Sequence, residues 1–367
     1  MIVCIIQARM GSSRFPGKVM TKIDGKPIIQ VLVERLKKSK LLDAIVIATS
    51  KKKENNVLDK FCKKKRILFF RGSESDVLSR YCNCAAKFEA KTIVRITSDC
   101  PLIDPEVVDK IVSFFLKKNF DYVSNTTPSL SRTWPDGSDV EVFSYEALKK
   151  LNKKKLNKFH REHVTTFFYK SKKFKSHQIK NNYDWSNYRY TMDYPEDLTV
   201  IKKIFGHLKR KKKFGYLPQI ISILKQDKKI QKINLMLLKK NLINGFRKIG
   251  LRNGKVIMLY VNLKPFYKIT NIPYPTLTNT IVKAVKYFKP QSILVPSFTY
   301  SVTKSKKFDV CKNKSEVGRF SEEIRLNFSK TRTLDPVFSV MDVKNWLANQ
   351  RKINTNISFG DHSIWKR

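Results

Sequence analysis

The sequence opens with MIVCIIQARMGSSRFPGKVM (residues 1–20), in which an apolar run ends at Gln7 and a basic loop with two glycines follows. Residues 1–8 have the pattern of a fully buried strand, because apolar side chains occupy consecutive positions. A strand followed by a basic, glycine-containing loop is how α/β proteins bind phosphate, since backbone N–H groups and cationic side chains can surround an anion there. The opening therefore predicts an α/β fold with an anion site beside its first strand.

Two common phosphate-binding motifs do not match this loop. Five residues separate Gly11 from Gly17, whereas the Walker motif has four, and Val19 follows Lys18 where that motif has serine or threonine. The dinucleotide pattern G-x-G-x-x-G is also absent from the sequence. An anion would have to bind here in another arrangement, and an ordinary solvated loop remains the alternative.

Apolar strands and amphipathic helices alternate after the opening loop, which is typical of a mostly parallel sheet with helices on both faces. We expect strands at 43–50, 91–100, 120–125 and 138–144, and helices at 26–40, 104–119 and 194–205. In the helix at 104–119, Asp104 is expected to be the N-cap residue and Pro105 to begin the helix. Loop residues at the carboxyl ends of such strands line the crevice in which α/β proteins bind ligands.

Acidic residues follow several of these strands, where a carboxylate is costly unless a cation accompanies it. The stretches are VRITSDCPLID (94–104) with Asp99, WPDGSDVEVF (134–143) with Asp136, Asp139 and Glu141, and YRYTMDYPEDL (188–198) with Asp193. Asp193 is expected at the end of a further strand. Two carboxylates on separate strand ends that face a basic loop are suited to bind Mg²⁺ together with a triphosphate.

These motifs together resemble the cytidylyltransferase-like family. The stretches IIQARMGSSRFPGK, FRGSESDVLSRY, VRITSDCPLIDP, WPDGSDVEVFS, REHVT and MDYPEDL occur in the family's order and spacing over about 1–235. The family includes the spore coat polysaccharide biosynthesis F proteins and enzymes that activate 3-deoxy-manno-octulosonate and acylneuraminate. The resemblance implies a Rossmann-like nucleotide-diphospho-sugar transferase sandwich. It also implies an enzyme of cell-surface polysaccharide biosynthesis that joins a sugar to CMP from CTP, with Mg²⁺, and releases pyrophosphate.

The resemblance also implies roles for individual residues. The catalytic residues would be Arg14, Lys18, Asp99 and Asp193, of which Asp99 and Asp193 would ligate Mg²⁺. The nucleotide would contact Ala8, Arg9, Ser12, Arg14, Lys18, Gly72, Ser73, Asp76 and Arg80. The sugar would face Asp139, Glu141, Arg161, Glu162, His163 and Arg189. Arg161 and Arg189 are suited to bind a sugar carboxylate through two hydrogen bonds each, which favours an acidic sugar.

The cytidylyltransferase-like domain is expected at 1–235, with a basic connector and one helix at 206–235, and a second unit is expected at 236–367. Its pattern of helix, strand, helix and strand, ending in SFGDHSIW (358–365), resembles the amino-terminal half of the aminoglycoside 3-N-acetyltransferase family, which uses acetyl-CoA. Asp335 stands where that family has a histidine, and a carboxylate cannot replace imidazole as a base near neutral pH without a large pKa shift. We therefore expect a degenerate partial domain, with a bifunctional acetyl-CoA-dependent enzyme as the alternative.

Charge and composition bear on partners and location. The chain has 75 Lys and Arg against 30 Asp and Glu, a net charge of +45, and its lysines occur in short runs throughout. This distribution indicates a general lysine bias, so no specific nucleic-acid partner is expected, and a non-catalytic polyanion-binding protein is the rival hypothesis. Scattered cysteines and the lack of a membrane-length apolar run favour a cytoplasmic protein without a membrane partner. A homodimer is left open.

Overall fold

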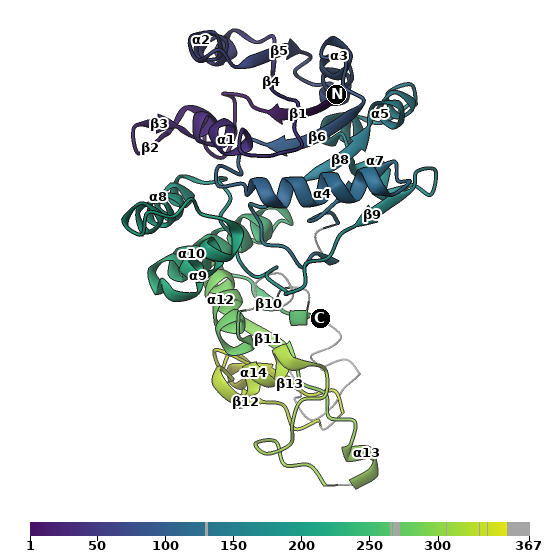
Figure 1. The fold of residues 1–367 in the computed structure, drawn as a ribbon. Coiled ribbons are helices and arrows are strands. Elements are labelled where there is room, and N and C mark those ends of the chain that lie inside the picture. The colour runs from purple at the N-terminus through teal and green to yellow at the C-terminus, as the bar shows by residue number, and fades with distance from the viewer. Residues whose placement is uncertain are drawn as a thin grey trace. The chain divides into compact units, whose positions relative to one another are not determined.

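The computed structural model describes residues 1–128, 131–264, 266, 272–305, 307–329, 331–335 and 337–350 (Figure 1). The motif SFGDHSIW (358–365) lies outside the described residues. The chain divides into two compact units, Met1–Ile233 and Asn234–Arg367. The boundary between them falls inside the helix α10 (Lys228–Lys248).

The first unit is built on a seven-stranded sheet. In spatial order its strands are β5 (Leu68–Gly72), β4 (Ala44–Ser50), β1 (Ile2–Gln7), β6 (Thr92–Thr97), β8 (Glu141–Ser144), β7 (Tyr122–Ser124) and β9 (Ser176–Gln178). The first four strands of this order pair in parallel, β8 runs antiparallel to β6 and β7, and β9 pairs in parallel with β7. The predicted α/β class with a mostly parallel sheet is confirmed.

The side chains of β1 enter two apolar clusters on opposite faces of this sheet. Cys4 and Ile6 belong to one cluster, and Val3 and Ile5 belong to the other. Successive strand residues point to opposite faces, so an uninterrupted apolar strand is expected where helices cover both. The opening run of the sequence is apolar for this reason.

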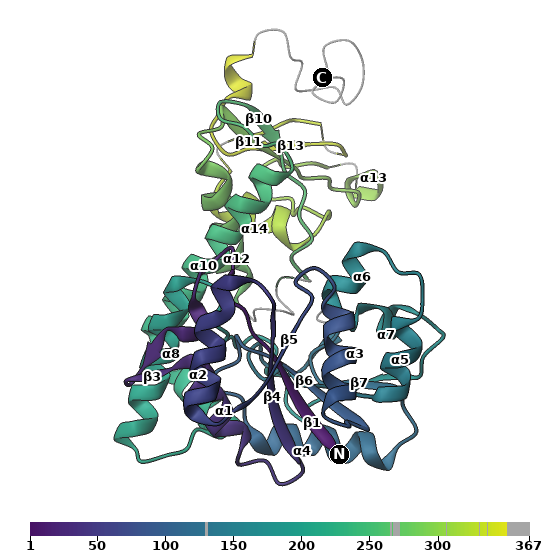
Figure 2. The ribbon, with the colours of Figure 1, turned by 90° about the horizontal axis from the view of Figure 1, so that it is seen from above.

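Helices lie on both sides of the central strands, as Figure 2 shows for α1, α2 and α8 on one side and α3, α5 and α7 on the other. The first cluster includes residues of α1 (Ile28–Leu36), α2 (Asn56–Lys65), α4 (Pro105–Lys117), α8 (Pro195–Arg210) and α9 (Leu217–Gln226). The second includes residues of α3 (Val77–Lys87), α5 (Tyr145–Asn152) and α7 (Thr166–Lys170). The unit's short elements are η1 (Lys18–Met20), β2 (Lys22–Ile23), β3 (Lys26–Pro27), η2 (Lys53–Asn55) and α6 (Lys158–His163).

The predicted start of α4 is confirmed in detail. Asp104 is the N-cap residue and accepts a hydrogen bond from the backbone N–H of Glu106 at 2.8 Å, and Pro105 is the first helical residue. The other carboxylate oxygen of Asp104 accepts the backbone N–H of Leu217 at 2.6 Å. One buried aspartate therefore holds the start of α4 and the start of α9.

The stretch 206–235, expected as a basic connector with one helix at the end of the first domain, contributes α9 to the first unit. A buried arginine secures its approach: Arg35 of α1 donates hydrogen bonds to the carbonyls of Ile103, Phe214 and Gly215 at 2.7, 2.8 and 2.7 Å. Its guanidinium also lies 4.3 Å from the centre of the Phe214 ring. Arg35 thus joins three segments that are distant in the sequence.

The second unit has a four-stranded sheet in the order β10 (Val256–Met258), β11 (Ser292–Pro296), β13 (Val340–Asp342) and β12 (Thr331–Arg332). Its other elements are α12 (Tyr274–Lys286), α13 (Val302–Ser305), α14 (Arg319–Asn327) and η4 (Leu347–Asn349). The predicted order of helix, strand, helix and strand is observed as α10, β10, α12 and β11. Within the described parts of the chain, no helix is long and apolar enough to cross a membrane.

Replacing Arg35 by methionine tests the link between α1 and the segment before α9. The change leaves three carbonyls without their donor, and each unsatisfied buried acceptor costs about 1–3 kcal/mol. We expect Arg35→Met to lower the free energy of unfolding by about 3 kcal/mol or more, measured by urea denaturation. Lys37→Met, at the exposed end of the same helix, is the control and should stay within about 0.5 kcal/mol of wild type. Equal effects of the two changes would contradict this role.

Candidate active site

The carboxylates of Asp99 and Asp193 converge on the ammonium group of Lys18. Lys18 Nζ lies 3.5 Å from Asp99 Oδ2 and 3.5 Å from Asp193 Oδ1, so these oxygens are within twice that distance of each other. Only 11% of the Lys18 side chain is exposed, and its ammonium also donates to the carbonyl of Met192 at 2.7 Å. The opening loop, the end of β6 and the start of α8 therefore meet at one cation.

Asp99 carries a negative charge that the site stabilises. Burial by itself would raise the pKa of its carboxyl group, but the Lys18 ammonium and the Thr97 hydroxyl outweigh burial and lower this pKa. The backbone carbonyl of Asp99 accepts hydrogen bonds from the N–H of Met192 at 2.8 Å and from the hydroxyl of Thr191 at 3.0 Å. Asp99 therefore holds the segment that leads to Asp193 as well as the lysine.

The segment before Asp193 does not form the predicted strand, so that prediction was wrong. It makes one isolated bridge, between Arg189 and Asp136. This bridge does not extend into a regular ladder, because the segment that contains Asp136 turns at the next residue, Gly137, which has a φ of +113°. A Cβ at Gly137 would lie 2.9 Å from Tyr190 Cδ2, so the close crossing also requires glycine.

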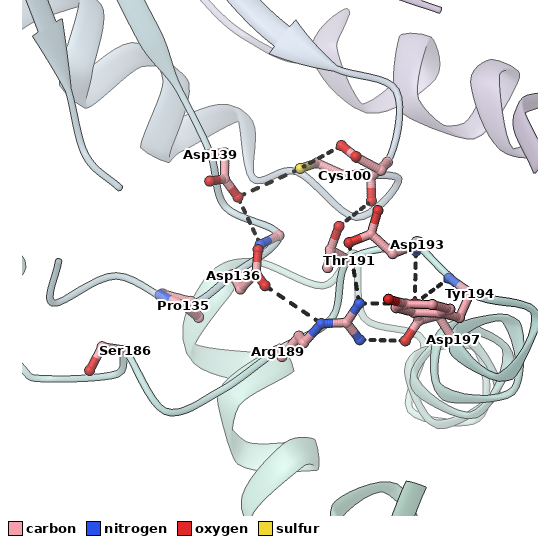
Figure 3. Close-up of polar contacts among 12 residues, drawn as sticks. Cys100, Pro135, Asp136, Asp139, Ser186, Arg189, Thr191, Asp193, Tyr194 and Asp197 are labelled. Atoms are coloured by element: carbon pink, nitrogen blue, oxygen red, sulfur yellow. Dashed lines mark hydrogen bonds and ion pairs between the residues drawn. The ribbon is translucent and has the colours of Figure 1, made fainter. Parts of the chain in front are cut away.

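Arg189 lies between carboxylates on both sides, as Figure 3 shows. It pairs with Asp197, and it lies 3.5 Å from an oxygen of Asp136 and 3.5 Å from an oxygen of Asp193. Asp197 is fully buried and accepts the backbone N–H groups of Asp193 and Tyr194 at 2.7 and 2.8 Å. The Arg189–Asp197 pair therefore fixes the backbone at Asp193.

The opening loop directs its cations toward this cluster. Arg14 donates to Asp193 Oδ1 at 2.8 Å, and its guanidinium lies 5.2 Å from the centre of the Tyr194 ring. Gly17 has a φ of +70° and donates its N–H to the carbonyl of Met10 at 2.8 Å, which closes the loop just before Lys18. The predicted pairing of a basic loop with both acids is therefore present in the structure.

The other predicted nucleotide-binding residues occupy two neighbouring segments. Ala8 is buried, Ser12 donates its N–H to the carbonyl of Met10, and Arg9 pairs with Glu74 at 3.2 Å. The Arg9–Glu74 pair joins the opening loop to the loop between β5 and α3. Of the remaining predicted residues, Ser73 and Asp76 lie in this loop, Gly72 ends β5 and Arg80 is part of α3. The two loops therefore lie side by side.

Residues in and beside the β5–α3 loop hold it in shape through contacts with each other. Arg80 is buried and donates to the carbonyl of Ser73 at 2.7 Å, and a Cβ at Gly72 would lie 2.7 Å from Arg80 Cγ. Asp76 caps α3 by accepting the N–H of Ser79 at 2.9 Å, and it pairs with Arg161 at 2.7 Å. Arg161, predicted to face the sugar, is therefore joined to this loop instead.

Asp136 and Asp139 form an acidic pair beside the cluster. Asp139 accepts hydrogen bonds from the Thr126 hydroxyl at 2.6 Å and from the N–H of Gly137 at 2.9 Å. Burial and the nearby charge of Asp139 raise the pKa of Asp136 to about 7. Burial also raises the pKa of Asp139. The raised pKa values indicate that nearby cations do not fully compensate the charges of the Asp136 and Asp139 carboxylates.

A pocket of about 210 Å³ adjoins Asp139. Its lining residues are Arg95, Thr97, Thr126, Thr127, Asp139, Glu141, His163, Thr165, Thr166 and Tyr169. Three of the residues predicted to face the sugar, Asp139, Glu141 and His163, are among them, whereas Arg161, Glu162 and Arg189 are not. Arg95 was not predicted; it lines the pocket and forms an ion pair with Glu141. It lies inside the strand β6, where the sequence pattern gives no signal for such a role.

The carboxylate oxygens around Lys18 decide whether the site can bind Mg²⁺. Asp99 and Asp193 offer hard oxygen ligands, and one oxygen of each lies 3.5 Å from the Lys18 ammonium. In the described ranges, no group of three or more His, Cys, Asp or Glu side chains is arranged to hold a metal ion. Mg²⁺ is commonly held by one or two carboxylates together with substrate phosphates, so the two aspartates fit Mg²⁺ only with a nucleotide present.

The raised pKa of Asp136 predicts a pH dependence of stability. An unfolded aspartate loses its proton near pH 3.9, whereas folded Asp136 keeps its proton up to about pH 7. Between these values the folded state binds the additional proton, so this group's contribution to stability falls as the pH rises. We expect Asp136→Asn to remove this loss, so that its stability relative to wild type increases from pH 5 to pH 8 in urea titrations with EDTA. Asp24→Asn, at an exposed site, should follow wild type; identical pH profiles for all three proteins would contradict the prediction.

Comparisons with known proteins agree with this architecture. The sequence model of a family described as "Cytidylyltransferase" matches residues 3–242. An uncharacterized protein of Methanocaldococcus jannaschii is 45% identical over 170 residues, which cover 46% of this chain and 68% of that protein. The spore coat polysaccharide biosynthesis protein SpsF of Bacillus subtilis is 33% identical over 212 residues, which cover 56% of this chain and 86% of that protein.

A solved structure extends the similarity to the fold. A cytidylyltransferase from Leptospira borgpetersenii serovar Hardjo-bovis superimposes with a TM-score of 0.58 and 32% identity, covering 62% of this chain and 95% of that one. The first unit accordingly has a Rossmann-like nucleotidyltransferase fold. Because the family match extends over more than half of the sequence, the chain belongs to the cytidylyltransferase family and is a nucleotidyltransferase.

Proposed function

We propose that the first unit transfers CMP from CTP to a sugar of a cell-surface polysaccharide and releases pyrophosphate. The observation that carries this proposal is the convergence of Asp99 and Asp193 on Lys18, next to the opening loop with Arg14. A polyanion-binding protein would have no use for two carboxylates held inside its basic site. Similarity to SpsF, whose name places it in polysaccharide biosynthesis, supports the kind of product.

The chemistry requires charge neutralisation at the phosphates. A sugar hydroxyl attacks the α-phosphorus of CTP, and negative charge builds up on the phosphate oxygens and on the leaving pyrophosphate. Lys18 and Arg14 are cations held in place by Asp99 and Asp193, so they are oriented before the nucleotide binds. Bound Mg²⁺, held by Asp99 and Asp193, would neutralise further phosphate charge.

The acceptor sugar fits the pocket beside Asp139. Its walls offer carboxylate oxygens and several threonine hydroxyls, which suit the hydroxyl groups of a sugar. The expected preference for an acidic sugar rested on Arg161 and Arg189, and both face protein carboxylates. Arg95 is the arginine in the lining, so an acidic sugar would have to share its guanidinium with Glu141.

Acetyl-CoA-dependent activity of the second unit has less support. The match to the cytidylyltransferase family ends at residue 242, so the resemblance of 236–367 to acetyltransferases stays a prediction. Asp335, in place of the expected histidine, accepts the backbone N–H groups of Val337 and Phe338 at 3.0 and 2.8 Å. The Asp335 carboxylate therefore stabilises a local turn by accepting two backbone N–H groups. This structural role supports the interpretation of a degenerate domain.

Replacing Asp99 tests the proposed function. Pyrophosphate release would be measured with CTP, MgCl₂ and a panel of neutral, amino and ulosonic acid sugars, and wild type should respond to at least one of them. We expect Asp99→Asn, which keeps the shape of the side chain, to lower the rate by about 10²–10³-fold, as for loss of a single electrostatic group in other active sites.

Asp24→Asn serves as the control because it removes a carboxylate at the exposed surface. It should keep the wild-type rate. Equal rates for Asp99→Asn and wild type, or no response of wild type to any sugar in the panel, would contradict the proposed function.

A further inference from the structure

The connection between α6 and α7 contains a strained turn centred on Val164. Val164 has a φ of 53° and a ψ of −66°, which a β-branched residue rarely adopts. The backbone N–H of Thr165 donates to the carbonyl of His163 at 2.6 Å, a hydrogen bond between residues two apart. These features define a γ-turn with positive φ, which is the rare and strained form.

Burial and one hydrogen bond oppose this strain. The Val164 side chain is fully buried in the same apolar cluster as Phe143 and Phe168. The hydroxyl of Thr165 donates to Glu141 Oε1 at 2.7 Å, and this contact is buried as well. A strained backbone persists only where its surroundings hold it, and such positions gather at functional sites.

The turn has a geometric consequence for the pocket. On a continuous helix, residues two apart differ by about 200° and point to opposite sides. His163 and Thr165 are two apart, and yet both line the same pocket. The turn at Val164 makes this possible, because it reverses the chain between the two residues.

The turn also acts on the acidic wall of the pocket. Glu141 Oε1 accepts hydrogen bonds from Thr165 and from the hydroxyl of Tyr122 at 2.6 Å, while the other oxygen pairs with Arg95. Thr165 therefore helps to set the orientation of Glu141, and through it that of Arg95. The turn therefore contains two lining residues, His163 and Thr165. Through the Thr165 hydroxyl it is linked to two more, Glu141 and Arg95.

We infer that Val164 is a positioning residue for the acceptor sugar. The strained turn at Val164 holds His163 and Thr165 in the pocket that receives the sugar. This inference rests on the proposed function, because the pocket is assigned to the sugar there. It goes beyond that function, since Val164 itself touches no substrate and acts through its neighbours. Because the turn acts on the residues that line the sugar pocket, we expect it to affect binding of the sugar and to leave binding of CTP unchanged.

The test compares Val164→Ala with Val164→Gly, which remove nearly the same buried side chain. Glycine adopts positive φ without strain, whereas alanine does not. With the sugar that wild type accepts from the panel, we expect Val164→Ala to raise the KM for the sugar about tenfold or more. Val164→Gly should stay closer to wild type, and the KM for CTP should be unchanged in both.

A purely structural role gives the opposite order. Val164→Gly would then be the more damaged protein, and both KM values would change together; that result overturns the inference. Thr165 provides a second pair of variants that is independent of the buried valine. Thr165→Val, without the hydroxyl, should raise the KM for the sugar, whereas Thr165→Ser should rescue it, and equal values for these two would also count against the inference.

Crystal structures of the two Val164 variants decide the inference without any activity. In Val164→Ala the hydrogen bond between Thr165 and His163 should be lost and one of the two side chains should leave the pocket, while Val164→Gly should keep both. A Val164→Ala structure that retains the turn overturns the inference. If wild type releases no pyrophosphate with any sugar, the proposed function is refuted instead. The crystal structures and the activity assay therefore test the inference and the proposed function separately.

Discussion

The active site depends on the ion pairs that the Lys18 ammonium makes with Asp99 and Asp193. Two carboxylates in a poorly solvated crevice would repel each other, and a cation between them turns this repulsion into attraction. Because the three residues come from the opening loop, the end of β6 and the start of α8, their interaction also fixes how these segments meet. The crevice is therefore charged and ordered before any nucleotide enters it.

Around this centre, the two sides of the site are built differently. On the phosphate side, Arg14 is half exposed and reaches the cluster from a glycine-containing loop. On the acceptor side, Glu141 and Thr165 are buried and joined by hydrogen bonds, next to a strained turn. The phosphate side thus relies on charge and the acceptor side on a fixed shape, which fits a common nucleotide and a selective sugar pocket.

The sequence predicted the features that depend on local pattern. The apolar run of β1, the cap at Asp104 and the basic loop after Gln7 follow from strand burial, capping and charge, and the structure has all three. The proximity of Asp99 and Asp193 was also predicted. The strand expected before Asp193 is absent, because the neighbouring segment turns at Gly137 and leaves one isolated bridge.

What the sequence could not predict depends on contacts between distant segments. Arg95 occupies an ordinary strand position, and its pairing with Glu141 arises from the register of β6 against β8. The partner of Asp197 and the positive φ of Val164 likewise exist only once tertiary packing outweighs local preference. In a chain with 75 basic and 30 acidic residues, the acids that follow expected strand ends were the signal that indicated a site.

Binding of one divalent ion by both Asp99 and Asp193 can be seen by anomalous diffraction from crystals grown with Mn²⁺ and a non-hydrolysable CTP analogue. We expect a single manganese peak within bonding distance of one oxygen from each aspartate, with the triphosphate next to Arg14 and Lys18. A peak bound by neither aspartate, or a triphosphate bound away from the opening loop, would refute the shared site.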